Sequence, residues 1–340
     1  MNRFSLNLLR NLRTYWQVNA KRRTSVTINQ NIKGRDFLDV NDFTLDELKL
    51  IMWTALDLKA RFKNTFIRDM HDSDGTMISS LLCEPSVKNQ INIEKASQLM
   101  GARTCTIIDQ HWESAECLSE TGRLLSIMSQ VILASSRCGK SLCELSAGAT
   151  VPVINMGSSN SNPLAAIAHA ITILTRLNRL ERVRIAWVGP SNSSVLSSLL
   201  MMMPKFRTHL HMSTENCNTP VNLEKALKLA SSYRCEIHHS SSPERATYRA
   251  DAIITTSHSF DELRITRKLV DEAALKWIFL HDLPRTRNEV TDDVFYHKTN
   301  SLVWESAENH AWALMAVMMQ VLTEYRPSIA TPTFTEEQPT

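Results

Sequence analysis

Residues 163–180, PLAAIAHAITILTRLNRL, have the pattern of a largely buried helix, and the run RIAWV at 184–188 follows them closely. A short apolar run that ends at a Gly-Pro turn is typical of a strand buried on both faces. On either side of this helix and strand, short apolar runs alternate with helical patterns. Such alternation predicts parallel sheets covered by helices on both faces, which is an α/β fold.

The predicted strands form two groups, one before residue 163 and one after residue 180. They are 77–83, 104–108, 131–134 and 151–154 in the first group, and 184–188, 208–212, 235–238, 252–255 and 277–280 in the second. Helical patterns lie at 44–63, 91–100, 116–128, 141–147, 163–180, 196–203, 223–231 and 305–325. Pro327 is expected to end the last of them.

These groups predict two domains, each a parallel sheet with helices on both faces, joined by interdomain helices. The predicted boundaries are 31–165 and 166–304, followed by a C-terminal helix at 305–326 and a loose tail at 327–340. In open α/β sheets, ligands bind beyond the carboxyl ends of the strands. Candidate binding loops therefore start near Glu84, Ser135, Asn155, Gly189, Thr255 and His281.

The N-terminal segment is basic, and the first acidic residue is Asp36. Residues 1–23 combine apolar side chains, enough to cover one side of a helix, with Arg3, Arg10, Arg13, Lys21, Arg22 and Arg23. This pattern is typical of a mitochondrial transit peptide, so we predict that residues 1–30 direct the chain to the matrix and are removed. A basic surface helix or a nucleic-acid-binding arm is the alternative. Without those six charges, 32 basic and 35 acidic residues remain, which gives no electrostatic basis for binding nucleic acid.

Glycine is scarce, with 8 residues in 340, against a usual share of about 7%. Neither of the glycine-rich phosphate-binding motifs, G-x-G-x-x-G and G-x-x-x-x-G-K-[ST], occurs in the chain. We therefore predict no cofactor of the kind that such loops hold. The apolar runs also stay far below the ~18 residues that a membrane span requires, so no membrane partner is expected.

The cysteines and histidines indicate no special chemistry on their own. The seven cysteines include no C-x-x-C pair, and we predict reduced, mostly buried thiols. His209 and His211 alternate onto one face of a predicted strand, as two metal ligands would. A zinc site requires a third and usually a fourth ligand, and none stands at a plausible spacing in the sequence. We therefore predict no metal site.

Several stretches of the chain carry a resemblance to a known family. They are KGRDFL at 33–38, DFT at 42–44, WVG at 187–189, FLHDLPR at 279–285, AEN at 307–309, Trp312 and MAVM at 315–318. In this order and spacing the chain resembles the ornithine carbamoyltransferases. The resemblance implies a carbamoyl-phosphate domain, an ornithine domain and a homotrimer with active sites at the subunit interfaces. It also implies a mitochondrial enzyme with small-molecule substrates, which converts carbamoyl phosphate and L-ornithine to L-citrulline and phosphate without a cofactor.

The resemblance assigns site residues position by position. The family's Ser-Thr-Arg-Thr-Arg, which binds carbamoyl phosphate at a helix N-terminus, is Ser86-Val87-Lys88-Asn89-Gln90 here. In the same site Ser135 replaces a phosphate arginine, Asn162 and Ala165 replace the His and Gln of His-Pro-x-Gln, and His310 replaces the arginine after Ala-Glu-Asn. On the ornithine side the aligned residues are Asn192 and Thr256. The catalytic His-Cys-Leu-Pro reads His281-Asp282-Leu283-Pro284, so Asp282 stands where the family has cysteine.

The replaced residues predict weak or absent carbamoyl transfer. Arginines are replaced at Gln90, Ser135 and His310, and a hydrogen bond to a charged group contributes about 1.5–3 kcal/mol. If the three losses were independent, they would total about 4.5–9 kcal/mol, or roughly 10³ to 10⁶ in affinity. Neighbouring groups do not add strictly, so only the scale counts.

Two functions stay open at this point. One is carbamoyl transfer in which other basic residues, such as Arg137 or Lys140, hold the phosphate. The other is a non-catalytic family member that acts as a ligand-binding or assembly partner. Asp282 is either a solvated loop acid or a new partner for a cationic ligand.

Overall fold

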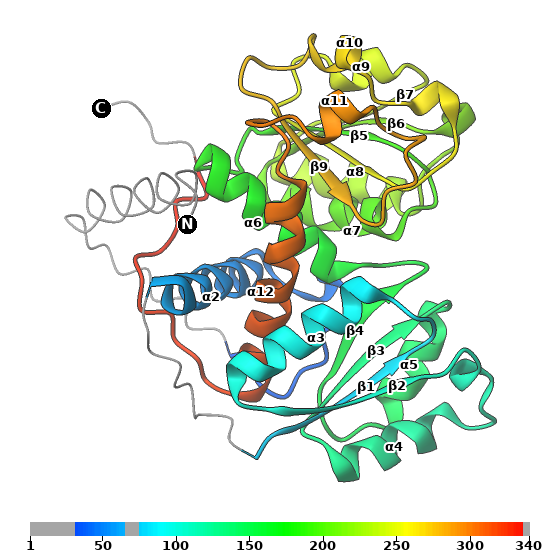
Figure 1. Ribbon diagram of the computed structural model, residues 1–340, viewed down its shortest axis with the longest axis vertical. Coiled ribbons are helices and arrows are strands. Elements are labelled where there is room, and N and C mark those ends of the chain that lie inside the picture. The colour runs from blue at the N-terminus through cyan, green and yellow to red at the C-terminus, as the bar shows by residue number, and fades with distance from the viewer. Residues whose placement is uncertain (1–30, 65–74, 336–340) are drawn as a thin grey trace.

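The computed structural model describes residues 31–64 and 75–335, which form two sheets joined by a central group of helices (Figure 1). Every pair of neighbouring strands in both sheets is parallel. The prediction of an α/β fold with two parallel sheets is confirmed. The predicted transit peptide at 1–30 lies outside the described residues.

The first sheet has the strand order β2-β1-β3-β4. Its strands are β1 (Met77–Leu82), β2 (Arg103–Ile108), β3 (Val131–Ser136) and β4 (Val153–Ser158). Helices α4 (Leu118–Met128) and α5 (Gly139–Gly148) cover one face, and α3 (Val87–Met100) packs on the other. Gly122 and Gly148 allow α4 and α5 to approach closely, because a Cβ atom at either position would overlap a backbone carbonyl of the other helix.

The second sheet has the strand order β7-β6-β5-β8-β9, so β7 and β9 form its two edges. Its strands are β5 (Arg184–Val188), β6 (His209–Ser213), β7 (Ile237–Ser240), β8 (Ala252–Thr256) and β9 (Ile278–Asp282). Helices α7 (Ser194–Met202) and α8 (Leu223–Tyr233) pack on one face. The short helices α9 (Pro243–Thr247), α10 (Arg267–Val270) and α11 (Asp292–Phe295) lie on the other.

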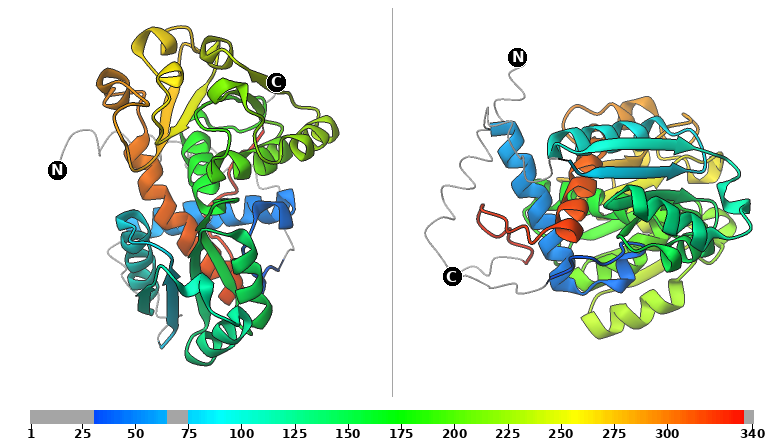
Figure 2. Two further views of the ribbon diagram at one scale, coloured as in Figure 1. Left: turned by 90° about the vertical axis from the view of Figure 1, so that its right-hand side faces the viewer. Right: turned by 90° about the horizontal axis from the view of Figure 1, so that it is seen from below.

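Three long helices, α2 (Leu45–Asn64), α6 (Pro163–Leu177) and α12 (Val303–Leu322), lie between the two sheets (Figure 2). Helix α12 contacts α2, α3, α6 and β9, and it is almost wholly buried. The apolar core that it shares with these elements is continuous from one sheet to the other. Lys205 adds a polar link, because its buried ammonium donates to the carbonyls of Val40 and Phe43 at 3.0 and 2.7 Å.

Each predicted strand is present, with its ends displaced by a few residues at most. The largest shift is at the end of β4, which runs to Ser158 instead of 154; its start is two residues later than predicted because Pro152 has no N–H to donate. Four residues expected at the starts of loops lie within strands instead: Ser135 in β3, Asn155 in β4, Thr255 in β8 and His281 in β9. The 3-10 helices are η1 (Val40–Asp42), η3 (Trp112–Ser114), η4 (Met203–Phe206), η5 (Glu215–Cys217) and η6 (Asp261–Leu263).

The chain after α12 is packed against the fold, so the prediction of a loose tail is wrong for residues 327–335. The carbonyl of Ile329 accepts a hydrogen bond from Trp53 Nε1 at 3.1 Å, and its N–H donates to Asp57 Oδ1 at 3.1 Å. Phe334 is 7% exposed, and its ring lies 5.8 Å from that of Phe206. The composition of the tail does not reveal these anchors, because each partner lies far away in sequence.

The prediction of mostly buried cysteines is also wrong. All seven are free thiols, but only Cys83 is buried and Cys235 is intermediate. The exposed ones are Cys105, Cys117, Cys138, Cys143 and Cys217. Apolar neighbours in sequence do not bury a cysteine that lies on the solvent side of a helix or of an edge strand such as β2.

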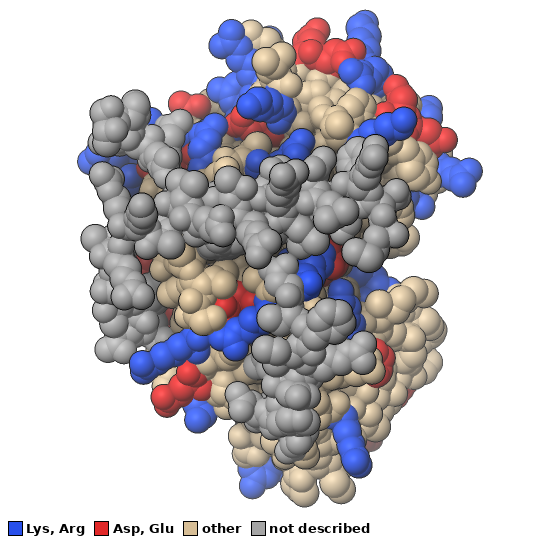
Figure 3. All heavy atoms as spheres, turned by 60° about the vertical axis from the view of Figure 1, so that its left-hand side comes forward, with Lys and Arg blue, Asp and Glu red and all other residues tan. Residues whose placement is uncertain are grey.

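The surface carries charges of both signs. Lys, Arg, Asp and Glu side chains are interspersed on the face shown in Figure 3, as far as the described residues extend. Within residues 31–64 and 75–335, no helix has the length and apolar character needed to cross a bilayer.

Candidate active site

The N-terminus of α3 and the carboxyl end of β9 meet between the two sheets, beside α6 and α12. Ser86 caps α3, because its Oγ accepts a hydrogen bond from the N–H of Asn89 at 3.2 Å. The first turn of a helix presents free N–H groups that favour an anion. Strand β9 ends at Asp282 and therefore brings a carboxylate toward this helix N-terminus.

Lys88 and Asp282 form an ion pair that joins the two halves of the site, with 2.7 Å between Nζ and Oδ1. Their side chains are 22% and 14% exposed. Burial alone would raise the pKa of Asp282, but the charge and hydrogen bond of Lys88 help to hold it below its usual value. Asp282 is therefore not a solvated loop acid, because it ends β9 and its carboxylate pairs with a cation of the chain itself.

Three buried histidines surround the ion pair: His169 on α6, His281 on β9 and His310 on α12. Nδ1 of His169 lies 2.8 Å from Ser306 Oγ, and Nδ1 of His310 lies 3.1 Å from Asn92 Nδ2. Burial lowers the pKa of His169 to about 4 and that of His310 to about 3. These two imidazoles are therefore neutral at pH 7 and add no positive charge to the site.

A buried carboxylate, Glu289, holds His281 in place. His281 Nε2 lies 2.9 Å from Glu289 Oε1, and neither side chain is exposed. Glu289 also accepts hydrogen bonds from the N–H and Oγ1 of Thr286 at 2.9 and 2.5 Å. Burial would raise the pKa of Glu289, but these hydrogen bonds lower it to about 2. Glu289 therefore acts as a charged anchor for the His281 ring next to Asp282.

The space that remains between these side chains is about 10 Å³, roughly what one water molecule requires. Among the described residues that line it, Lys88 is the only lysine or arginine. The full lining consists of Lys88, Ala165, Ala168, His169, His281, Asp282, Leu283, Ser306, Ala307 and His310. The chain's own side chains thus fill the site.

Five site residues predicted from the sequence line this cavity, namely Lys88, Ala165, His281, Asp282 and His310. Near them, Asn89 Nδ2 donates to the carbonyl of Met156 at 3.3 Å, and Thr256 Oγ1 donates to the carbonyl of Asp282 at 3.3 Å. Ser86, Val87 and Gln90 flank Lys88 at the start of α3 but are not part of the lining.

The remaining predicted residues lie away from the cavity lining. Ser135 Oγ accepts a hydrogen bond from the N–H of Cys83 at 3.2 Å, and Asn162 caps α6 by accepting from the N–H of Ala165 at 3.2 Å. Asn192 is exposed in the turn between β5 and α7. Ser135 and Asn162 thus have structural hydrogen bonds of their own.

The sequence prediction missed His169, Ser306, Asn92 and Glu289. His169 had a detectable signal, because it is the one ionisable residue within the apolar run Pro163–Leu174. Burial of an ionisable residue is unfavourable unless it has partners, so such a residue marks a polar site inside the core.

Neither of the proposed compensating cations lines the cavity. The guanidinium of Arg137 donates to the carbonyls of Gln110 and Cys83 at 3.2 and 3.4 Å. Lys140 is 82% exposed and lies 3.5 Å from Glu144. Arg137 thus contacts the segment between β1 and the α3 cap, because Cys83 is the first residue after β1.

Comparison with known protein families gives two matches that follow the two sheets. Residues 35–175 match the carbamoyl-P binding domain of the aspartate/ornithine carbamoyltransferases, and residues 181–321 match their Asp/Orn binding domain. The chain belongs to the aspartate/ornithine carbamoyltransferase family. In this carbamoyltransferase-family chain, the first sheet lies within the residues that match the carbamoyl-P binding domain. The second sheet lies within those that match the Asp/Orn binding domain.

Individual relatives confirm the predicted family. The mitochondrial ornithine transcarbamylase of Gallus gallus is 32% identical over 327 residues, which cover 90% of this chain and 91% of the relative. The mitochondrial ornithine carbamoyltransferase of Aquarana catesbeiana is 31% identical and covers 89% and 91%. Among solved structures, the ornithine carbamoyltransferase from Pyrococcus furiosus has a TM-score of 0.79 at 28% identity, covering 86% of this chain and 98% of that one.

Proposed function

We propose that this carbamoyltransferase-family chain has weak or no ornithine carbamoyltransferase activity, because the Lys88–Asp282 ion pair occupies its interdomain site. The observation that carries the proposal is the 2.7 Å contact, which neutralises the cation that a substrate phosphate would need. A bound phosphate would have to separate this pair and lie beside a carboxylate. Removing one partner from a fully buried ion pair costs about 3–5 kcal/mol, which is an upper bound for this half-buried pair.

The charge around the ion pair supports the same proposal. Carbamoyl phosphate carries two negative charges, and a site for it requires several cations and rigid donors. His310, at the position that the resemblance aligns with an arginine, has a pKa of about 3 and is neutral at pH 7. Among the described residues that line the cavity, Lys88 is the only lysine or arginine, and the negative charge of Asp282 cancels its charge.

Carbamoyl transfer also requires donors aimed at the carbonyl oxygen as the amine attacks it. Ala165, at the position aligned with the family's glutamine, has no polar side-chain atom. Asn162, aligned with the family's histidine, uses its carboxamide oxygen to cap α6. Among the described residues that line the cavity of about 10 Å³, none is a cysteine. These features together favour a non-catalytic family member.

Two measurements on the purified chain test this proposal: citrulline formation with saturating substrates, and calorimetry with carbamoyl phosphate. We expect no citrulline above background and no binding at micromolar concentration. The single variant Asp282→Cys should behave in the same way, because one residue restores neither the cations nor the donors. Citrulline formed at rates typical of enzymes, on the order of 1–10³ per second, would overturn the proposal.

The alternative is carbamoyl transfer in which Arg137 supplies the missing charge. The position of its guanidinium, 3.4 Å from the carbonyl of Cys83, favours Arg137 over Lys140. This alternative predicts that Arg137→Ala abolishes any carbamoyl-phosphate binding, whereas Lys140→Ala leaves it unchanged. Equal binding by both variants would exclude Arg137 as the compensating residue.

We further propose that the chain assembles as a homotrimer, as the resemblance implies. Exposed apolar side chains on the first domain support self-association, because such surfaces often mark protein interfaces. They are Val87 and Ile91 on α3, Ile107 and Ile108 on β2, and Leu124, Ile127 and Met128 on α4. Light scattering should report the mass of a trimer, and a monodisperse monomer at micromolar concentration would contradict this.

We also propose import into mitochondria. The basic, acid-free N-terminal segment supports it, and two relatives are named as mitochondrial enzymes. A fusion of residues 1–35 to a fluorescent protein should locate to mitochondria, and the same fusion with its six basic residues at 1–23 changed to glutamine should not. A diffuse cytosolic signal from the unmodified fusion would contradict import.

A further inference from the structure

Strands β6 and β7 place four potential metal ligands on one face of the second sheet. His209 and His211 are two residues apart on β6. Glu236 directly precedes β7 and His238 lies on it, again two residues apart, so each pair shares a face. His211 and His238 are direct partners in the parallel ladder. Strand pairing therefore supplies the third ligand that the sequence spacing did not reveal.

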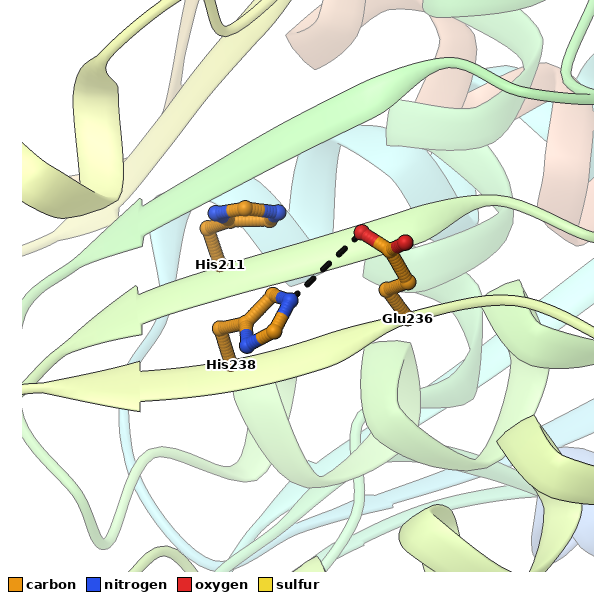
Figure 4. A group of neighbouring side chains, drawn as sticks. All are labelled: His211, Glu236 and His238. Carbon is orange, nitrogen blue, oxygen red and sulfur yellow. Dashed lines mark ion pairs between the residues drawn. The ribbon is translucent and has the colours of Figure 1, made fainter.

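Three of these side chains converge, as Figure 4 shows for His211, Glu236 and His238. One ligand atom from each lies within 4.8 Å of the other two, and His238 Nε2 is 3.5 Å from Glu236 Oε2. The two imidazole rings are 4.8 Å apart between their centroids. Nε2 of His211 is buried and has no hydrogen-bond partner among the described residues.

The surroundings leave room for an ion and a further ligand. His211 and His238 border an open depression of about 620 Å³. Two arginines lie near: Arg245 also borders the depression, and Arg184 on β5 is the ladder partner of His209. His209 supports the cluster, because its Nδ1 accepts a hydrogen bond from the N–H of Glu236 at 3.1 Å.

We propose that His211, Glu236 and His238 bind a divalent transition-metal ion of the zinc type at the β7 edge of the second sheet. Two imidazoles and one carboxylate suit zinc, whereas calcium and magnesium prefer oxygen ligands alone. With bonds of about 2.1 Å, tetrahedral ligand atoms lie about 3.4 Å apart. Glu236 and His238 are 58% and 60% exposed, so their side chains can rotate to close the remaining distance. The fourth position stays open to water or a small ligand.

The direct test is zinc binding by the full chain, purified without a polyhistidine tag and titrated in competition with a chromogenic chelator. We expect one zinc ion per chain with micromolar or tighter affinity. Cobalt at the same site should give the visible absorption of a tetrahedral ion without a thiolate charge-transfer band. Absence of stoichiometric zinc at micromolar concentration would overturn the proposal, and so would a thiolate band, which would assign the metal to a cysteine such as Cys217.

Matched variants locate the site. His211→Ala, Glu236→Gln and His238→Ala should each weaken zinc binding at least tenfold. The control is His239→Ala on the same strand. His239 borders the same depression, but its Nε2 lies 2.8 Å from Thr214 Oγ1. A control that loses as much affinity as His238→Ala would contradict the proposal. Glu236 and His238 are surface residues, so their variants keep the test decisive even where His211→Ala fails to fold.

Discussion

The interdomain site and the β7 edge of the second sheet both contain histidine and carboxylate side chains. In the first region a carboxylate is paired with a lysine and enclosed, whereas in the second the side chains are exposed or lack a partner. Between the domains, Lys88 and Asp282 neutralise each other at 2.7 Å in a space of about 10 Å³. At the sheet edge, Glu236 and His238 are more than half exposed, and Nε2 of His211 has no partner in the part of the chain that the structure describes. Ligand-type residues therefore indicate a binding site only where the chain leaves their ligand atoms available.

The largest expected effect comes from rebuilding the interdomain site. We expect the combined variant to gain about 10³-fold or more in carbamoyl-phosphate affinity, since three hydrogen bonds to charged groups contribute about 4.5–9 kcal/mol. Binding should recover before citrulline formation does. The substitutions are Lys88→Arg, Gln90→Arg, Ser135→Arg, Asn162→His, Ala165→Gln, Asp282→Cys and His310→Arg.

Calorimetry measures this gain, with the single variant Asp282→Cys as the control. If the combined variant folds and still does not bind carbamoyl phosphate, the aligned positions are not those of a phosphate site, and the assignment of these residues by resemblance is wrong.

Breaking the ion pair should have the next largest effect. Asp282→Asn leaves the ammonium of Lys88 little exposed and without its 2.7 Å partner, which is expected to cost up to about 3–5 kcal/mol of unfolding free energy. The double variant Lys88→Met/Asp282→Leu should recover most of this loss, because apolar residues often replace a buried ion pair without cost. Urea unfolding of the single and double variants measures both changes. Unchanged stability of Asp282→Asn would show that the pair does not form in solution.

A pH dependence should follow from Glu289, which supports His281 in the same site. The pKa of Glu289 in the folded protein is about 2, below its ordinary value of 4.5. Ionisation therefore favours the folded state, and this stability is complete above about pH 4.5 and is lost as the pH falls toward 2. The shift corresponds to about 3 kcal/mol.

Glu289→Gln should be less stable than the unmodified chain at pH 7 by about this amount, and the difference in unfolding free energy should shrink near pH 3. An equal difference at both pH values would contradict this.

Much of the fold could be predicted because apolar periodicity is local. The prediction of 184–188 gives the bounds of β5 because this run is buried and ends at Gly189-Pro190. Strand β4 extends four residues beyond its predicted end because polar Asn155 and Ser158 continue it. Asn155 Nδ2 donates to the carbonyl of Leu38 at 2.9 Å, a tertiary contact that no local pattern reveals.

The site could be predicted only in part, because its decisive contacts join distant residues. The motif comparison located Lys88 and Asp282, but their pairing across 194 residues depends on how β9 packs against α3. His211 and His238 become neighbours only through the register of β6 and β7. A sequence pattern therefore identifies residues with suitable chemistry, whereas the fold decides which of them neutralise one another.

The smallest expected effect separates the two regions most clearly. His238→Ala removes a side chain that is 60% exposed, whose ion pair with Glu236 at 3.5 Å is open to solvent. Exposed ion pairs contribute little, and surface substitutions usually change stability by less than about 0.5 kcal/mol. In metal-free solution we therefore expect its unfolding midpoint in urea to match that of the unmodified chain, in contrast to Asp282→Asn. A large loss of stability in His238→Ala would mean that His211, Glu236 and His238 stabilise the fold without a metal ion. The two regions would then not differ in their contribution to stability.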